Sequence, residues 1–292
     1  MPTPARLAAA VVVAIALIAY ALAQPSLTPP AGPIEESGRF GTLIELNQEN
    51  TPGDANALFV ITQPGSYVLT ADADSGARDG IHIASDGVTI DLNGYTLSGD
   101  GSAGSTGVTA IPAQTPTGPF FNVTLRNGAV TDYEEGFNSS NFFQGIGSFV
   151  TTELRTIRLE RLHVTDTERA VRQLGGGVIE SCIIAATVTG ITASNCVIAD
   201  CFIRVDADGS GPRGLFGTNV TVRDTHAVIT NPLASNGECY QLTDSVITGC
   251  TASGQSSGFR LNGKTLANSC VADTVAQGGI LTGAALAVDC NF

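Results

Sequence analysis

Apolar and polar positions repeat along the chain with a period of about 20 residues, and cysteine marks the same place in most repeats. Aligned on that place, the steps from Leu162 onward are 20, 19, 24, 25, 20 and 20 residues. The aligned column consists of Leu162, Cys182, Cys201, Thr225, Cys250, Cys270 and Cys290, with Gly128 in an earlier row. A fixed period of this length is typical of a solenoid.

The flanking columns are apolar as well. Three residues before the aligned column stand Leu125, Leu159, Ile179, Ile198, Val222, Ile247, Ala267 and Ala287. Two residues after it stand Val130, Val164, Ile184, Ile203, Ala227, Ala252, Ala272 and Phe292. Further upstream in the row, a small residue precedes a bulky one in Gly190-Ile191, Gly214-Leu215, Gly258-Phe259 and Gly279-Ile280. Each row therefore predicts a strand, a polar turn, a second strand and a third strand opened by glycine.

Three short strands per row, stacked row upon row, predict an all-β fold. The expected fold is a single-stranded right-handed parallel β-helix, a solenoid of about nine coils with three short strands per coil. The handedness follows the preference for right-handed crossovers between parallel strands. A TIM barrel or a Rossmann fold would need helical segments between the strands, and the pattern contains none.

The cysteines of the aligned column are interpreted as core residues, because a small apolar side chain fits between stacked coils. Adjacent coils lie ~4.8 Å apart, whereas a disulfide brings Cβ atoms to ~3.8 Å. We therefore expect buried free thiols in preference to disulfides. Cys196 and Cys239 lie in other columns, and the redox state of all seven cysteines stays open.

The N-terminal segment predicts export. Arg6 precedes an apolar run of 17 residues that ends in Ala21-Leu22-Ala23, a small-x-small cleavage signal. Residues 1–23 are interpreted as a signal peptide, with an uncleaved membrane anchor as the alternative. Residues 24–40 form an expected Pro-rich disordered tether, and 41–292 an expected β-helix domain. Within that domain we expect an N-terminal cap at 41–78 and no evident C-terminal cap; the expected location is secreted, periplasmic or cell-surface.

Two early segments carry a family resemblance. They read TPGDANALFVITQPGSYVLT from Thr51 to Thr70 and DGIHIASDGVTIDLNGYTLSG from Asp79 to Gly99. Both closely resemble the N-terminal half of secreted bacterial right-handed β-helix proteins of uncharacterised function, in the pectate-lyase-like superfamily. The resemblance implies the fold and export, and it implies no activity.

Charge excludes some partners. The formal net charge is −13, and Lys264 is the only lysine among 14 basic residues. A strongly acidic protein repels nucleic acid, anionic lipid and polyanionic sugars. We therefore expect no nucleic-acid partner, and no membrane span once the signal peptide is removed.

Candidate catalytic residues are few. Asp200 and Asp224 share the turn column in neighbouring rows, ~5 Å apart, which is near the spacing of a retaining glycosidase pair. The base of a lyase could only be an arginine, such as Arg223 or Arg126 in the same turn region, or Lys264. The competing interpretation is that Asp is a good turn former, and the sequence favours it. The sequence also contains no adjacent Asp pair and no Gly-His-Gly segment.

A calcium site is a weaker candidate. Asp206 and Asp208 lie in a glycine-rich excursion and could supply oxygen ligands to Ca²⁺. Glycine stands at position 217, where the glutamate of an EF-hand would belong, so a solvated acidic loop is the favoured interpretation. No other cofactor is expected.

Two functional classes remain. The favoured one is a secreted β-helix protein with a structural, surface or carbohydrate-binding role and a polysaccharide or cell-surface partner. The alternative is a carbohydrate-active enzyme, a polysaccharide lyase or glycoside hydrolase, acting on a neutral or cationic polymer.

A homo-oligomer, or a partner at the C-terminal end, is expected because the final row carries apolar residues without a polar cap. An outward apolar stripe, of Val178, Val197, Val246, Leu266 and Leu286, predicts a covered side face or a subunit contact. The ligand and the oligomeric state stay open.

Overall fold

The computed structural model of the chain describes most residues from position 42 onward. The described ranges are 42–110, 122–138, 157–206, 211–230, 237–254, 257–273, 277–283 and 285–292. The expected signal peptide, the expected tether and Asp208 lie outside them. Across the described ranges, no helix has the length and apolar character needed to cross a bilayer.

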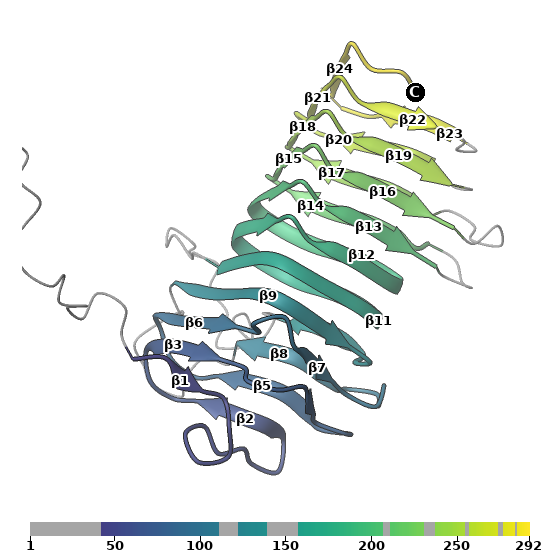
Figure 1. Cartoon of the computed structure of the whole chain (residues 1–292). Coiled ribbons are helices and arrows are strands. Elements are labelled where there is room, and N and C mark those ends of the chain that lie inside the picture. The colour runs from purple at the N-terminus through teal and green to yellow at the C-terminus, as the bar shows by residue number, and fades with distance from the viewer. Residues whose placement is uncertain are drawn as a thin grey trace, which may run out of the picture. The chain divides into compact units, whose positions relative to one another are not determined.

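Parallel pairing arranges the described strands on three faces, which we call the first, second and third sheets and which the chain visits in turn as it coils (Figure 1). Long strands that turn the corners join these faces into one hydrogen-bonded sheet. The first sheet contains β1 (Ile44–Glu45), β3 (Gly65–Val68), β6 (Val88–Asp91), β9 (Val123–Thr131), β11 (Ile157–Glu180), β12 (Ile183–Ala199), β15 (Thr221–Arg223), β18 (Val246–Thr248), β21 (Leu266–Asn268) and β24 (Leu286–Val288). The long strands β9, β11 and β12 turn corners and continue into the neighbouring sheets.

The other two sheets complete each coil. The second sheet adds β4 (Ala73–Asp74), β7 (Thr96–Ser98), β13 (Phe202–Val205), β16 (His226–Ile229), β19 (Thr251–Gly254) and β22 (Val271–Asp273). The third sheet adds β2 (Ala57–Ile61), β5 (Asp79–Ile83), β8 (Thr106–Ala110), β10 (Glu135–Asn138), β14 (Arg213–Thr218), β17 (Glu238–Thr243), β20 (Ser257–Asn262) and β23 (Gln277–Leu281). The prediction of an all-β right-handed parallel β-helix is confirmed.

The strand register confirms the aligned columns. In the first sheet Ile179 pairs with Ile198, which lies beside Val222, and the ladder continues to Ala287. The coil count differs slightly from the expected nine, because the regular part makes about eight turns. Three earlier rungs extend the ladder through the N-terminal segment, at Ile44, Tyr67 and Ile90.

The cysteine column lies inside the coil, as predicted. Cys182, Cys201, Cys250 and Cys270 are buried as free thiols, and Cys290 in the last coil is half-buried. Each Sγ donates to the carbonyl oxygen two residues earlier, at 3.1 Å for Cys201 and 3.3 Å for Cys250. Thr225 belongs to the same column, because its Oγ1 donates to the Arg223 carbonyl at 2.9 Å. A thiol or hydroxyl thus hydrogen-bonds the preceding turn in each of these rows, and it is buried in all of them except the row of Cys290.

The residue before this column takes a left-handed backbone conformation. The non-glycine residues with φ between 48° and 58° at this position are Asn127, Arg161, Ser181, Asp200, Asp224, Ser269 and Asp289. Gly249 occupies the same place at 62°. Asn, Asp and Gly adopt this region with little strain, which explains the mostly small or polar turn pair.

Glycine in the third sheet is required by close packing. A Cβ atom on Gly190 would lie 2.4 Å from Cγ2 of Ile203, and one on Gly214 would lie 2.5 Å from the Cys239 carbonyl oxygen. Both positions therefore face the core, together with the bulky residue that follows.

In the last row the register of the third sheet differs by one residue from the sequence alignment of Gly258-Phe259 with Gly279-Ile280. Gly279, not Ile280, pairs with Phe259, and Ile280 pairs with Arg260. The Phe292 ring fills the space that a side chain at 279 would need, with its centroid 4.9 Å from that of Phe259. The expected alignment of Ile280 with Phe259 is therefore wrong, because a residue from the next turn supplies the missing core side chain.

The apolar stripe on the first sheet faces outward, as strand alternation predicts, because each member directly precedes an inward-facing residue. Exposure is 37% for Val197, 41% for Val246, 39% for Leu266 and 57% for Leu286. These four side chains are therefore not covered by the part of the chain that the structure describes, whereas Val178 is half-buried. A contact with a second chain stays a prediction.

Candidate functional site

A row of charged side chains runs across the first sheet on its outward face. We call this set the charged ladder. It consists of Asp91, Arg126, Arg158, Glu160, Arg161, Glu180 and Arg223. Asp91, Arg126 and Glu160 occupy the same register position in successive strands, one residue after the inward apolar column. Strand alternation therefore directs them to solvent while the core residues point inward.

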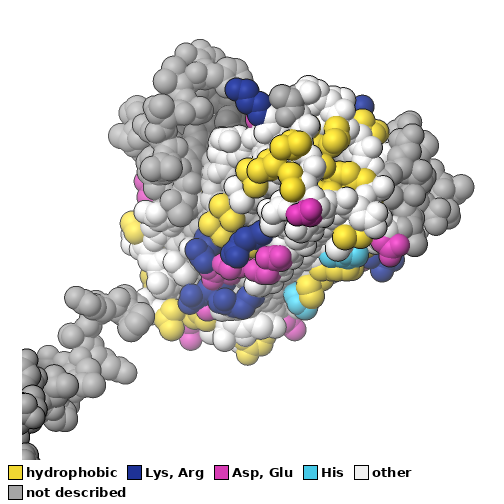
Figure 2. Space-filling model, turned by 90° about the horizontal axis from the view of Figure 1, so that it is seen from above, with side chains coloured by type: hydrophobic (Ala, Val, Ile, Leu, Met, Phe, Trp, Pro, Cys, Tyr) yellow, Lys and Arg dark blue, Asp and Glu magenta, His cyan; other side chains and the backbone are white. Residues whose placement is uncertain are grey.

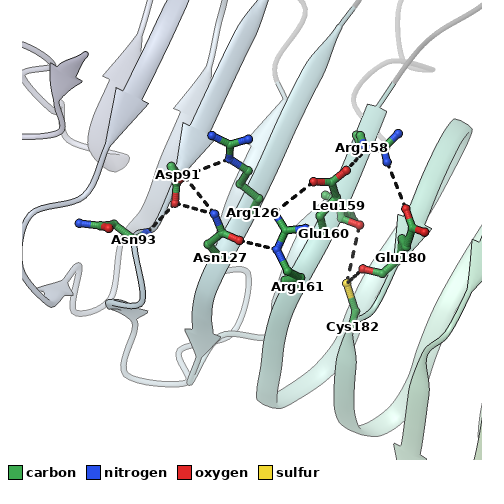
Figure 3. A network of polar contacts seen from close by, with 10 residues as sticks. All are labelled: Asp91, Asn93, Arg126, Asn127, Arg158, Leu159, Glu160, Arg161, Glu180 and Cys182. Atoms are coloured by element: carbon green, nitrogen blue, oxygen red, sulfur yellow. Dashed lines mark hydrogen bonds and ion pairs between the residues drawn. The ribbon is translucent and has the colours of Figure 1, made fainter.

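The N-terminal part of the ladder centres on Asp91 (Figure 3). Its Oδ2 accepts a hydrogen bond from Nε of Arg126 at 3.0 Å. The Asn127 amide donates to both carboxylate oxygens of Asp91, at 3.1 and 3.0 Å. The Asn93 backbone N–H also donates to Oδ1, at 2.9 Å. This carboxylate is thus fixed in position from two neighbouring coils.

The middle of the ladder is a chain of ion pairs. Arg158 contacts Glu160 on its own strand and donates to Glu180 of the following coil at 3.1 Å. Arg161 lies 3.5 Å from Glu160. The outermost pair joins Arg223 to Glu180 at 3.8 Å. Along this register the charge changes sign from Asp91 to Arg126 and again at Glu160, whereas Glu180 is followed by the uncharged Ala199 before Arg223.

The arginines are the solvent-exposed members of the ladder. Their side chains are 40% exposed at Arg126, 43% at Arg158 and 51% at Arg223, whereas that of Glu160 is 13% exposed. Exposed ion pairs contribute only ~0–1 kcal/mol each to stability. Figure 2 shows acidic and basic side chains lying next to one another beside a patch of hydrophobic side chains. The ladder thus presents guanidinium groups that remain accessible to a ligand.

The predicted turn residues occupy the positions expected of turns. Asp200 and Asp224 follow the outward strand positions in neighbouring coils, are exposed, and have φ of 53° and 48°. Their backbone N–H groups donate hydrogen bonds to the next coil. Asp200 donates to the Arg223 carbonyl oxygen at 3.2 Å, and Asp224 donates to the Thr248 carbonyl oxygen at 3.0 Å. The structure supports their turn role, and of the three catalytic candidates Arg223 alone belongs to the charged ladder.

The calcium candidates are only partly described. Asp206 is half-exposed and pairs with Arg204 at 3.0 Å, and Asp208 lies outside the described residues. Among the residues with described positions, no group of three or more His, Cys, Asp or Glu side chains is arranged to hold a metal ion.

A second polar surface lies on the third sheet, and the sequence analysis did not find it. In β5 two outward residues, Asp79 and His82, flank the inward pair Gly80 and Ile81. The same arrangement recurs at Thr106 and Thr109 in β8. We call this surface the paired face. Its signal in the sequence is a polar residue directly before an inward-facing glycine, with a second polar residue three positions after the first.

The fold and the charged ladder define a right-handed parallel β-helix protein with a polar strip along one sheet. No protein-family model matches the chain, and no curated protein matches its sequence. Among solved structures, it is similar to the A-module of the mannuronan C-5 epimerase AlgE4 from Azotobacter vinelandii. The two share 11% identity with a TM-score of 0.39, over 78% of this chain and 86% of the module.

Proposed function

We propose that the protein is an exported β-helix protein that binds an extended neutral polysaccharide along the charged ladder. The observation that carries the proposal is the row of exposed arginine side chains, Arg126, Arg158 and Arg223, on one flat parallel sheet. Successive coils repeat every ~4.8 Å, a spacing comparable with a sugar ring. Hydrogen-bonding side chains occupy the coils from Asp91 to Arg223 except the one that contains Ala199.

The chemistry of the ladder suits hydroxyl groups. Guanidinium groups supply several planar N–H donors, and carboxylates supply acceptors, so a sugar hydroxyl finds both kinds of partner. Its four arginines and three acids leave a local charge close to zero, in a chain of net charge −13. A neutral polymer gains these hydrogen bonds without the repulsion that the remaining acidic surface imposes on a polyanion.

The proposal is tested by screening the mature protein against neutral, cationic and anionic glycans, with and without Ca²⁺. We expect binding to neutral polymers, and an affinity loss of about tenfold or more in Arg158→Gln and in Arg223→Gln, because each removes charge-assisted hydrogen bonds. Arg204→Gln is the matched control: Arg204 is also half-exposed and ion-paired, but it lies on the second sheet.

Two results would overturn this function. One is full-strength glycan binding in both ladder variants. The other is the absence of binding to every glycan, while the same reactions produce cleaved polymer. Cleavage would instead favour the carbohydrate-active enzyme, and dependence on Ca²⁺ would direct attention to Asp206 and Asp208.

A further inference from the structure

The last pair of the charged ladder, Glu180 with Arg223, contains hydrogen-bonding groups that the described residues leave unused. Nη2 of Arg223 lies 3.8 Å from Oε1 of Glu180, which is longer than a hydrogen bond. The other oxygen of Glu180 accepts from Arg158 at 3.1 Å (Figure 3). The Arg223 guanidinium makes no hydrogen bond with a residue that the structure describes. Both side chains reach solvent, with 51% of Arg223 and 32% of Glu180 exposed, so a ligand finds a donor and an acceptor there.

The two side chains come from coils on either side of a coil without a polar side chain. Glu180 pairs in register with Ala199, and Ala199 pairs with Arg223. Their backbones are therefore separated by two coil steps of ~4.8 Å each. In a trans amide the N–H and C=O bonds point to opposite sides, so its two partners must lie on opposite sides as well. An amide held by two hydrogen bonds of ~2.9 Å fits this arrangement.

The two charged groups can separate to admit an amide between them. They lean toward each other across Ala199, which is fully buried. An exposed ion pair is weak, because each charge remains solvated when the pair opens. The amide then hydrogen-bonds to both groups, and it needs no cavity below the surface of the sheet.

An apolar side chain lies beside this pair. Val197 precedes Ala199 by two residues, so it points to the same outward face, and it is 37% exposed. Its register partners are Val178, which is half-buried, and Thr221. Figure 2 shows hydrophobic side chains next to the acidic and basic ones on this surface. A methyl group attached to the amide gains free energy when Val197 covers it.

We propose that Glu180, Arg223 and Val197 form a subsite for the acetamido group of a neutral polysaccharide that contains N-acetylated amino sugars. The inference rests on the function proposed above and names the class of its ligand. The acetamido carbonyl oxygen accepts from Arg223, its N–H donates to Oε1 of Glu180, and its methyl group packs on Val197. A polymer of plain hexose has a hydroxyl group in place of the acetamido group, so it lacks the methyl contact and one of the two hydrogen bonds.

Two oligosaccharides of equal length isolate the acetamido group. Calorimetric titration of the mature protein compares the hexamer of β-1,4-linked N-acetylglucosamine with the hexamer of β-1,4-linked glucose, which differ only in the substituent at C2. We expect the acetylated hexamer to bind about tenfold more tightly, for one further hydrogen bond and one buried methyl group. Arg223→Gln should reduce this preference, whereas Arg158→Gln should weaken both hexamers and leave the preference in place.

Val197→Thr tests the apolar contact, because it replaces one methyl group by a hydroxyl group and keeps the β-branched shape. Affinity for the acetylated hexamer should fall about fourfold, and affinity for the glucose hexamer should stay the same. Val271→Thr is the matched control, since Val271 is 38% exposed on the second sheet. The subsite is disproved if the wild type binds both hexamers equally, or if Val197→Thr titrates like Val271→Thr. In either case a loss of binding in Arg158→Gln would still support the charged ladder, whereas the proposed function itself fails if neither hexamer nor any other glycan binds.

Discussion

Phe259 is the residue whose loss tests the internal packing of the coil most sharply. Its side chain is fully buried, and its ring lies 4.9 Å from Tyr240 on one side and 4.9 Å from Phe292 on the other. Phe259→Ala removes the middle ring of this stack. Large-to-small changes of a buried Phe cost ~3–5 kcal/mol, and each aromatic pair adds ~0.5–1.5 kcal/mol beyond area burial. We expect a loss of about 4 kcal/mol.

The assay is urea unfolding followed by far-UV circular dichroism, with hydrogen exchange to locate the loss. Because solenoid coils contact mainly their neighbours, protection should fall first in β20 to β24. Phe216→Ala is the control: Phe216 is outward-facing, with the Arg213 guanidinium 4.8 Å from its ring, and should cost about 1 kcal/mol. Equal unfolding midpoints for the two variants would refute the assignment of Phe259 to a stacked core.

Three further predictions concern thiols, turns and self-association. Cys290 should react with thiol reagents in the folded protein, whereas the six buried cysteines should react only after unfolding. Burial raises the pKa of the Cys196 thiol to about 11. The free energy of unfolding should therefore fall as the pH rises above 9.0, because the thiol ionises first in the unfolded chain. Asp224→Val should lower stability by ~1–2 kcal/mol, and Asp224→Gly by less, since φ is 48° there; urea midpoints measure both, and equal midpoints would contradict the turn role. Sedimentation should show self-association that Leu266→Asp weakens, because Leu266 is exposed within the apolar stripe; a wild-type monomer at micromolar concentration would disprove the contact.

The period of the chain was sufficient to predict the fold. Each coil repeats the same inward columns, so Ile179, Ile198 and Val222 align in the sequence as they pair in the first sheet. Local rules failed at the last row, because the space beside Gly279 is filled by Phe292 from the following turn. The residues around Gly279 alone do not predict that Phe292 fills this space.

The candidate sites were harder to predict. Attention fell on Asp200 and Asp224, since two carboxylates one coil apart suggest catalysis, yet their left-handed φ assigns them to turns. The charged ladder lies one residue earlier in the row and could have been found from strand alternation alone. The pairing of Asp79 with His82 could not, because simple alternation places residues three apart on opposite faces, and the inward bend at Gly80 is a packing effect.

The dependence of affinity on oligosaccharide length tests the central claim most directly. From Asp91 to Arg223 the charged ladder covers five coil steps, or about 24 Å at ~4.8 Å per coil. Calorimetric titration with a length series of the neutral glycan found in the screen should give an affinity that rises until the extended chain reaches about 24 Å and then levels off. If a monosaccharide binds as tightly as the long oligomers, the ligand does not lie along successive coils and the account is wrong.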